Sequence, residues 1–277
     1  MCLGAFFSMK LPVKPRNRKN SRCNLLFAWN LRGDGLDQHY RAAESHPSED
    51  RKFRLNQIFR QFFSDGQLVF DIGANDGQFS EKLLNWGARV VAVEPQAMCV
   101  EQMKARIGGH RALFIENCAV GATEGSVEMF IASTGSQISS GSRDWIDSVK
   151  NTGRFKGTDW TQSITVPMTS LDALIARHGQ PVFCKIDVEG FEPDVLSGLS
   201  QAISTISFEY TPEHAGAVAS CVRKIATLGS YRFNFAGHGW ETMYWPEWLK
   251  PEESILALKA PEDEELRKGG DVYARRD

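Results

Sequence analysis

Apolar residues occur in this chain as short continuous runs, separated by stretches with helical periodicity. Short apolar runs without polar alternation are typical of strands that are buried on both faces of a parallel sheet. They predict strands at 68–72, 89–94, 113–116, 182–187, 203–209 and 231–235. The helical periodicity predicts helices at 78–86, 96–107, 191–199 and 213–228. We therefore expect an α/β fold with a mainly parallel sheet, right-handed crossovers and helices on both faces.

The pattern changes in the middle of the chain. Residues 126–131 alternate between apolar and polar like a half-exposed strand, and 164–168 predict a second strand. The span 132–163 is rich in Ser, Thr and Gly, and is too long for a plain connection in a compact domain. We expect either a lid over the functional site or a partly disordered insertion. Its Trp145 and Trp160 either stack on a flat ligand such as a sugar or pack back onto the domain.

The two ends of the chain differ from its centre in composition. Residues 1–50 predict a flexible basic arm, because its first part is rich in Lys and Arg and lacks acids. The folded domain is expected at 51–250 and begins with an amphipathic helix at 51–64, whose aromatic face packs on the sheet. Residues 251–277 are predicted to form a charged tail with a frayed end.

Composition narrows the class of protein. The chain has 277 residues, a formal net charge of -2 and a pI of about 6.3. A nucleic-acid binder usually shows a basic face, so we expect no nucleic-acid partner. No apolar stretch approaches the ~18 residues that a membrane span needs. The six cysteines are scattered without a C-x-x-C pair, which argues against a zinc ribbon and favours a reducing, cytoplasmic location.

Polar residues follow nearly every predicted strand at its carboxyl end. In an open parallel sheet these ends meet at one edge, and ligands bind there. The residues brought to that edge are Asp71 with the loop 73–77, Glu94, Glu116 with Asn117, Asp187 with Glu189, and Glu209. The sequence therefore predicts a functional site along this edge.

The loop after the first strand indicates the kind of ligand. Gly73 and Gly77 permit a tight turn and close approach of a ligand, although a purely structural turn would use them too. A dinucleotide site has the spacing G-x-G-x-x-G, whereas this loop reads G-x-x-x-G and has Asp71 before it and Asp76 within it. Carboxylates repel pyrophosphate but attract an ammonium or sulfonium group. This disfavours an NAD-dependent oxidoreductase, one alternative function.

Glu94 indicates a ribose. A carboxylate at the end of the second strand can accept hydrogen bonds from ribose hydroxyls, although a surface Glu before the turn at Pro95 is the simpler interpretation. Together with the loop, Glu94 predicts a nucleoside that lacks phosphates and carries a positive centre. S-adenosylmethionine (SAM) meets this description, and we expect it as the cofactor.

Four segments resemble the FkbM-type SAM-dependent methyltransferases: FDIGANDGQFS, VVAVEP, ENCAVG and, most specifically, KIDVEGFEPDVLSGL. The resemblance covers roughly residues 66–235. It implies the class I methyltransferase fold, a Rossmann-like, mainly parallel seven-stranded sheet whose last pair includes one antiparallel strand. It also implies methyl transfer, which several relatives direct to a hydroxyl oxygen.

The resemblance also implies roles for single residues. It gives Glu94 to the ribose, Asn117 to the neighbourhood of the adenine and Asp187 to the methyl-transfer centre. The Ser139-Ser140 pair resembles a short serine motif of the family. The loop on the methionine side of SAM contributes Asp71, Gly73, Ala74, Asn75 and Gly77.

An alcohol acceptor needs a general base to remove its proton. The candidates at the sheet edge are Asp187, Glu189, Glu209 and His214. Glu189 alternatively holds the loop backbone, and His214 alternatively makes a structural hydrogen bond. Strand alternation places Lys185 on the same face as Asp187, and pairing would keep Asp187 ionised.

The acceptor and the assembly are less defined by the sequence. We expect a hydroxyl on a small molecule or glycan, and the sequence leaves room for a homo-oligomer. Some alcohol methyltransferases use Mg²⁺, but only Asp187 and Glu189 lie close together here, with no H-E-x-x-H or Cys/His cluster, so we expect no required metal. A non-catalytic SAM-binding module of the same fold remains an alternative to the enzyme.

Overall fold

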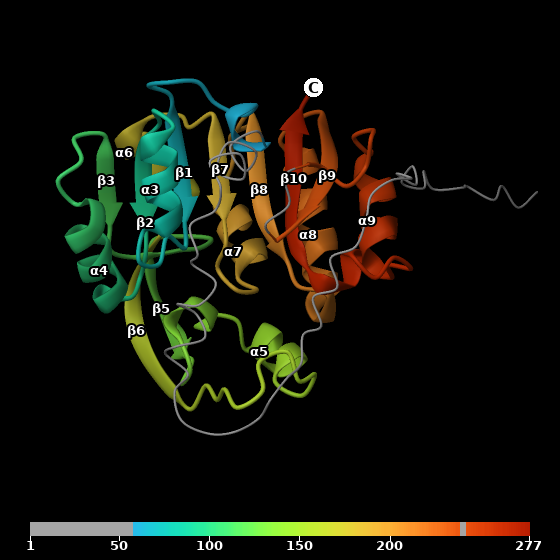
Figure 1. Cartoon of the computed structure of the whole chain (residues 1–277), viewed down its shortest axis with the longest axis horizontal. Helices are drawn as coiled ribbons and strands as arrows, with labels where there is room; N and C mark the ends of the chain where they lie inside the picture. Colours follow the sequence, from blue (N-terminus) through green and yellow to red (C-terminus); the bar gives the residue numbers. More distant parts are fainter. Residues whose placement is uncertain (1–57, 239–241) are drawn as a thin grey trace, which may run out of the picture.

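The computed structural model describes residues 58–238 and 242–277, which form an α/β fold around a seven-stranded sheet (Figure 1). The strand order is β3-β2-β1-β7-β8-β10-β9. The strands are β1 Leu68–Ile72, β2 Arg89–Val93, β3 Leu113–Glu116, β7 Phe183–Ile186, β8 Thr205–Tyr210, β9 Tyr231–Gly237 and β10 Gly270–Arg276. The pairs from β3 to β8 are parallel, and β10 runs antiparallel to both of its neighbours. The predicted fold class is confirmed.

Helices cover both faces of this sheet. One face carries α3 Gln78–Asn85 and α4 Ala97–Ile107, and the other carries α6 Leu171–His178, α7 Glu192–Ser197, α8 Ala215–Thr227 and α9 Pro251–Lys259. In β1, Phe70 packs on the side of α6 to α9, whereas Val69 packs with Leu83 of α3. Burial on both faces explains why these strands appear in the sequence as continuous apolar runs.

A second, three-stranded sheet lies beside the carboxyl ends of the parallel strands (Figure 1). It has the order β4-β6-β5 and consists of β4 Ala119–Val120, β5 Gly125–Ile131 and β6 Gln162–Thr169. Between β5 and β6 the chain forms η1 Ser136–Ile138 and α5 Arg143–Val149, and Trp145 and Trp160 pack edge to face at 6.1 Å between ring centroids. The span 132–163 therefore forms a folded insertion with its own small apolar core, which disfavours partial disorder, one of the two alternatives.

The C-terminal segment 251–277 differs from the predicted charged tail. It forms α9, a short turn of 3₁₀ helix, η3 Leu266–Lys268, and β10, which lies between β8 and β9 in the main sheet. Val272 and Ala274 of β10 have no exposed surface, while the charged Arg275 and Arg276 end the strand at the surface. The few apolar residues of this strand are flanked by charged residues in the sequence, so the local pattern did not predict a strand here.

The N-terminal prediction falls partly outside the described residues. This applies to the basic arm 1–50 and to the first part of the helix expected at 51–64. From residue 58 onward the aromatic face packs on the sheet as expected: Phe62 stacks on Phe183 and on Tyr273, each at 5.5 Å between ring centroids. Within the described residues, no helix has the length and apolar character to cross a membrane.

Candidate functional site

The loop between β1 and α3 packs tightly against the end of β7. Gly73 has a φ of +83°, and a Cβ at this position would lie 1.8 Å from the Asp187 carbonyl oxygen, so a side chain is excluded. The Gly73 and Ala74 N–H groups both donate to the Val93 carbonyl of β2. Gly77, with a φ of +82°, precedes α3. Gly73 therefore lets the loop backbone lie close to the ends of β2 and β7, the two neighbours of β1.

Glu94 follows β2 and its carboxylate is almost completely buried. Its Oε2 accepts from the Asn75 N–H at 3.0 Å, and its Oε1 accepts from the N–H of Gln96 at 2.9 Å and from the Gln96 side chain at 3.3 Å. Burial raises the pKa of Glu94, and these hydrogen bonds oppose the shift. Two carboxylate oxygens offer about four acceptor positions, so Oε2 keeps one for a ligand.

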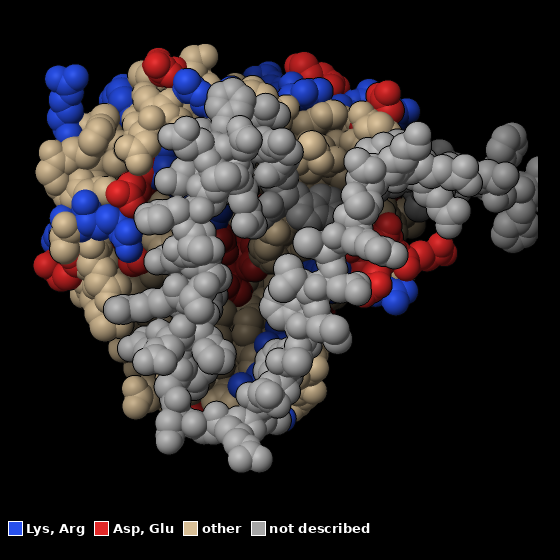
Figure 2. All heavy atoms as spheres, viewed as in Figure 1, with Lys and Arg blue, Asp and Glu red and all other residues tan. Residues whose placement is uncertain are grey.

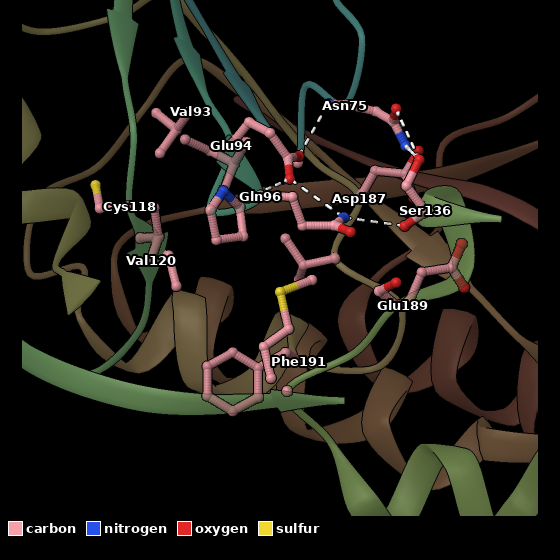
Figure 3. A pocket seen from close by; sticks show the side chains of 18 of the residues that line it. Asn75, Val93, Glu94, Gln96, Cys118, Val120, Ser136, Asp187, Glu189 and Phe191 are labelled. Atoms are coloured by element: carbon pink, nitrogen blue, oxygen red, sulfur yellow. Dashed lines mark hydrogen bonds between the residues drawn. The ribbon is translucent and has the colours of Figure 1, made fainter. Parts of the chain in front are cut away.

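A cleft of about 590 Å³ opens beside Glu94. Figure 3 shows Val93, Cys118 and Val120 on one side of the Glu94 carboxylate, and Asp187 and Glu189 on the other. Further apolar walls come from β5 and from the loop after β7, through Val127, Met129 and Phe191. The cleft therefore combines apolar walls with a buried acceptor at one end.

A second, more polar compartment of about 800 Å³ continues from this cleft and shares Gly73, Asn75, Asp187 and Glu189 with it. It is also lined by Asp71 of β1, which is fully buried. Asp71 Oδ2 accepts from the Ser80 hydroxyl at 2.6 Å, whereas Oδ1 is buried and has no hydrogen-bond partner among the described residues. Burial raises the pKa of Asp71, and the charge of Lys185 opposes the shift.

Lys185 and Asp187 form the pair that strand alternation predicted. Lys185 Nζ donates to Asp187 Oδ2 at 2.5 Å. Burial lowers the pKa of Lys185, but the negative charges of Asp187, Asp71 and Asp271 outweigh burial and raise it overall. Lys185 therefore stays charged at neutral pH and stabilises the carboxylates around it.

Glu189 and Glu209 lie beside this pair. One carboxylate oxygen from each of Asp187, Glu189 and Glu209 lies within 4.8 Å of the other two. Burial and the neighbouring carboxylates raise the pKa values of Glu189 and Glu209 well above the usual range. Figure 2 shows acidic side chains in the hollow at the centre of the face that is turned to the viewer. Lys185 alone does not neutralise this group of carboxylates.

The loop after β7 is held by residues that the sequence analysis did not assign to it. Glu192, at the start of α7, accepts from the N–H groups of Val188 and Gly190 at 3.2 Å, the task considered for Glu189. Burial raises the pKa of Glu192 to about 7. Glu192 lies inside the KIDVEGFEPDVLSGL segment, so the family resemblance of that segment was the sequence feature that could have indicated its role.

The insertion also contacts this loop. The Ser140 hydroxyl donates to the Glu189 carbonyl at 2.6 Å, and the Trp145 side chain packs on Gly190. Ser139 instead accepts from the Ala132 N–H at 3.1 Å. Trp145 is fully buried and its Nε1–H donates to Thr211 at 3.1 Å, so it packs back onto the domain rather than facing a ligand.

Four predicted site residues line neither compartment: Gly77, which precedes α3, Glu209 of β8, Asn117 and His214. Asn117 donates from Nδ2 to the carbonyls of Glu94 at 2.9 Å and Pro95 at 3.1 Å, so it supports the turn behind Glu94. His214 directly precedes α8; burial lowers its pKa, and the charge of Asp144 in α5 opposes the shift. Neither residue lines the cleft or the compartment described above.

The family model of the methyltransferase FkbM domain matches residues 71–237, which include the whole of the two compartments. The chain belongs to the FkbM methyltransferase family. It is accordingly a SAM-dependent methyltransferase, and SAM is its cofactor. This decides against the interpretation as an NAD-dependent oxidoreductase.

The solved structures resemble this methyltransferase only weakly. A TehB-like SAM-dependent methyltransferase from Corynebacterium glutamicum is 10% identical, with a TM-score of 0.44, covering 87% of this chain and 95% of that one. A precorrin-6Y C5,15-methyltransferase from Geobacter metallireducens is 10% identical, with a TM-score of 0.41, covering 84% and 90%. A search of curated proteins finds no significant match. The assignment to the family rests on the match of the family model.

Proposed function

We propose that this FkbM methyltransferase binds SAM across the two joined compartments and transfers its methyl group to a hydroxyl oxygen of a small molecule or glycan. The observation that carries the proposal is the arrangement of an apolar cleft with Glu94 at one side and a carboxylate-lined compartment that adjoins it. SAM has the matching parts: an apolar base, a ribose, and a methionine end with ammonium and sulfonium charges.

Single residues support this placement of SAM. The free acceptor position of Glu94 Oε2 suits a ribose hydroxyl, and the apolar walls at Val120 and Met129 suit the adenine. The unpartnered Asp71 Oδ1 suits the methionine ammonium, because a buried acceptor without a donor costs free energy that an N–H group would recover. Gly73 and Asn75 line both compartments and let the ligand approach the backbone.

The chain contributes alignment and proton removal to the reaction. Bound SAM supplies a methyl group that its sulfonium makes electrophilic, so the protein must orient the acceptor and exclude water. Glu189 and Glu209 have raised pKa values and lie together, which suits a carboxylate that takes the hydroxyl proton near neutral pH. Lys185 keeps Asp187 in place beside them.

The charge of the compartment favours a neutral acceptor. Carboxylates would hold an amine in its protonated form, which has no free electron pair for methylation. They would also repel the phosphates of a nucleic acid. A hydroxyl group on a small molecule or glycan avoids both penalties.

Calorimetry and a labelling experiment test the proposal. We expect micromolar SAM binding and no NAD binding, followed by transfer of a labelled methyl group from SAM to a component of a metabolite or glycan extract. The product is a methyl ether, which resists mild alkali, and Asp187→Asn loses the transfer. Glu252→Gln, on the exposed surface of α9, is the matched control and retains it. Label found in RNA or in a methylated amine would contradict the hydroxyl acceptor.

A further inference from the structure

Three carboxylates converge where β7 and β8 end. Asp187 follows β7, Glu189 lies in the loop after it, and Glu209 is the next-to-last residue of β8. One oxygen from each lies within 4.8 Å of the other two, although like charges repel at this distance. Lys185 pairs with Asp187, but Asp271 of β10 lies opposite Glu209 in the sheet register and adds a further carboxylate. A side-chain hydrogen bond links Glu189 to Glu209, and the fold holds the three carboxyl groups together although they repel one another when ionised.

Glu209 provides a second, separate observation. Its Oε2 is buried and has no hydrogen-bond partner in the part of the chain that the structure describes. A carboxylate oxygen that is removed from water without a donor is costly, unless a cation contacts it. The backbone of Glu209 is fixed in place, because β8 pairs with β7 on one side and with β10 on the other.

We infer that Asp187, Glu189 and Glu209 bind a divalent cation of the oxygen-preferring kind, such as Mg²⁺, Mn²⁺ or Ca²⁺. Such ions bind carboxylate oxygens at about 2.0–2.6 Å, so opposite ligands lie up to about 4.1–5.2 Å apart. The three oxygens lie within 4.8 Å of one another, which is inside the span that the ligands of Ca²⁺ reach. The ligand set contains no imidazole or thiolate, which disfavours Zn²⁺.

The site leaves room for more than the protein ligands. Three carboxylates fill only part of the six or more positions around such an ion, and Asp187 and Glu189 also line the polar compartment. The open positions therefore face the space in which the acceptor is expected. That the cation holds an oxygen atom of the acceptor rests on the proposed function, whereas binding of the cation does not. An oxygen of Glu189 or Glu209 that binds the cation is not the one that takes the hydroxyl proton.

Manganese titration of the full chain tests the site without an activity assay. The protein is treated with EDTA, desalted, and titrated with Mn²⁺ near neutral pH, with free Mn²⁺ measured by electron paramagnetic resonance. We expect one site per chain, and at least tenfold weaker binding in Glu209→Gln and in Glu189→Gln. Glu252→Gln, which removes one exposed acid that lines neither compartment, keeps wild-type affinity. Circular dichroism checks the fold of each variant, and Glu189→Gln decides if Glu209→Gln does not fold.

Two results overturn the inference: no Mn²⁺ binding up to millimolar concentration, or equal affinity in the wild type and the folded cluster variants. SAM binding is measured separately in EDTA. If the protein binds SAM but not Mn²⁺, the cation site is disproved and the proposed function stands. If it binds Mn²⁺ but not SAM, the proposed function is disproved and the cation site stands.

Discussion

Glu94 has two tasks at the scale of a single residue. Its carboxylate ties the end of β2 to the loop after β1 through the Asn75 N–H, and it keeps an acceptor position toward the cleft. Gln96 extends this link to the insertion, because its side chain donates to the Ser136 carbonyl at 3.1 Å (Figure 3). The ribose acceptor that we propose is therefore fixed before the ligand arrives, which lowers the entropic cost of binding.

The raised pKa of Glu94 makes SAM binding depend on pH. As the pH falls through this pKa, Glu94 takes up a proton and loses its charge and part of its acceptor capacity, so the affinity for SAM decreases, by at most about tenfold per pH unit. The folded state binds this proton more readily than the unfolded chain does, so the same change increases the contribution of Glu94 to stability. Asn75, Gln96 and the charge of Asp71 surround the group.

Calorimetry with SAM between about pH 5 and pH 8 checks this prediction against Glu94→Gln, which cannot ionise. The variant should bind SAM more weakly at high pH and show a flatter pH profile. Asp71 titrates in both proteins, so the difference between them isolates Glu94. Parallel profiles would contradict the role of Glu94.

At the scale of elements, the insertion and the main sheet meet at the loop after β7. Glu189 has a φ of +54°, a left-handed conformation that is unfavourable for a residue with a side chain. The Ser140 hydroxyl holds its carbonyl, and Glu192 holds the N–H groups on either side of it. Contacts from both elements thus maintain a strained loop that carries a proposed catalytic carboxylate.

Gly190→Ala tests this junction. Gly190 has a φ of +89°, and a Cβ here would lie 2.2 Å from Trp145 Cβ, so both strain and overlap arise. We expect the free energy of unfolding to fall by about 2–5 kcal/mol, measured by urea denaturation. Gly153→Ala is the matched control: its φ is +85° but nothing lies within 4 Å, so it should cost only about 1–2 kcal/mol. Equal losses would show that the Trp145 contact is unimportant.

At the scale of the whole molecule, β10 completes the sheet. It pairs antiparallel with β8 over Gly270–Arg275 and with β9 over Gly270–Arg276, so the last residues of the chain join two strands that precede them. Tyr273 of β10 also stacks on Phe62, near the start of the described chain. The two ends of the described chain therefore stabilise each other through the sheet.

Truncation of the chain tests whether β10 is an essential strand of the sheet or a dispensable tail. Deletion of residues 270–277 removes the partner of both β8 and β9 and exposes buried faces, so we expect an insoluble or non-cooperatively unfolding protein by circular dichroism and urea denaturation. Deletion of Asp277 alone, which ends the chain beyond β10, should leave the transition cooperative. A soluble, cooperatively folded product from the longer deletion would contradict the central position of β10.

The sequence by itself determined those features that depend on neighbouring residues. The bounds of β1 and β3, the turn glycines at Gly73 and Gly77, and the alternation that pairs Lys185 with Asp187 follow from local patterns of burial and backbone conformation. The placement of the carboxylates at one edge of the sheet followed from the α/β alternation, because parallel strands end on the same side.

Only the tertiary structure decided the features that depend on distant partners. The place of β10 between β8 and β9 rests on pairing across many residues, and its short apolar core gives no strong local signal. Likewise, Asn117 and Glu192 acquire their tasks from backbone groups that folding brings to them. Whether a side chain reaches a ligand or a neighbouring N–H depends on three-dimensional packing, which residue spacing alone does not fix.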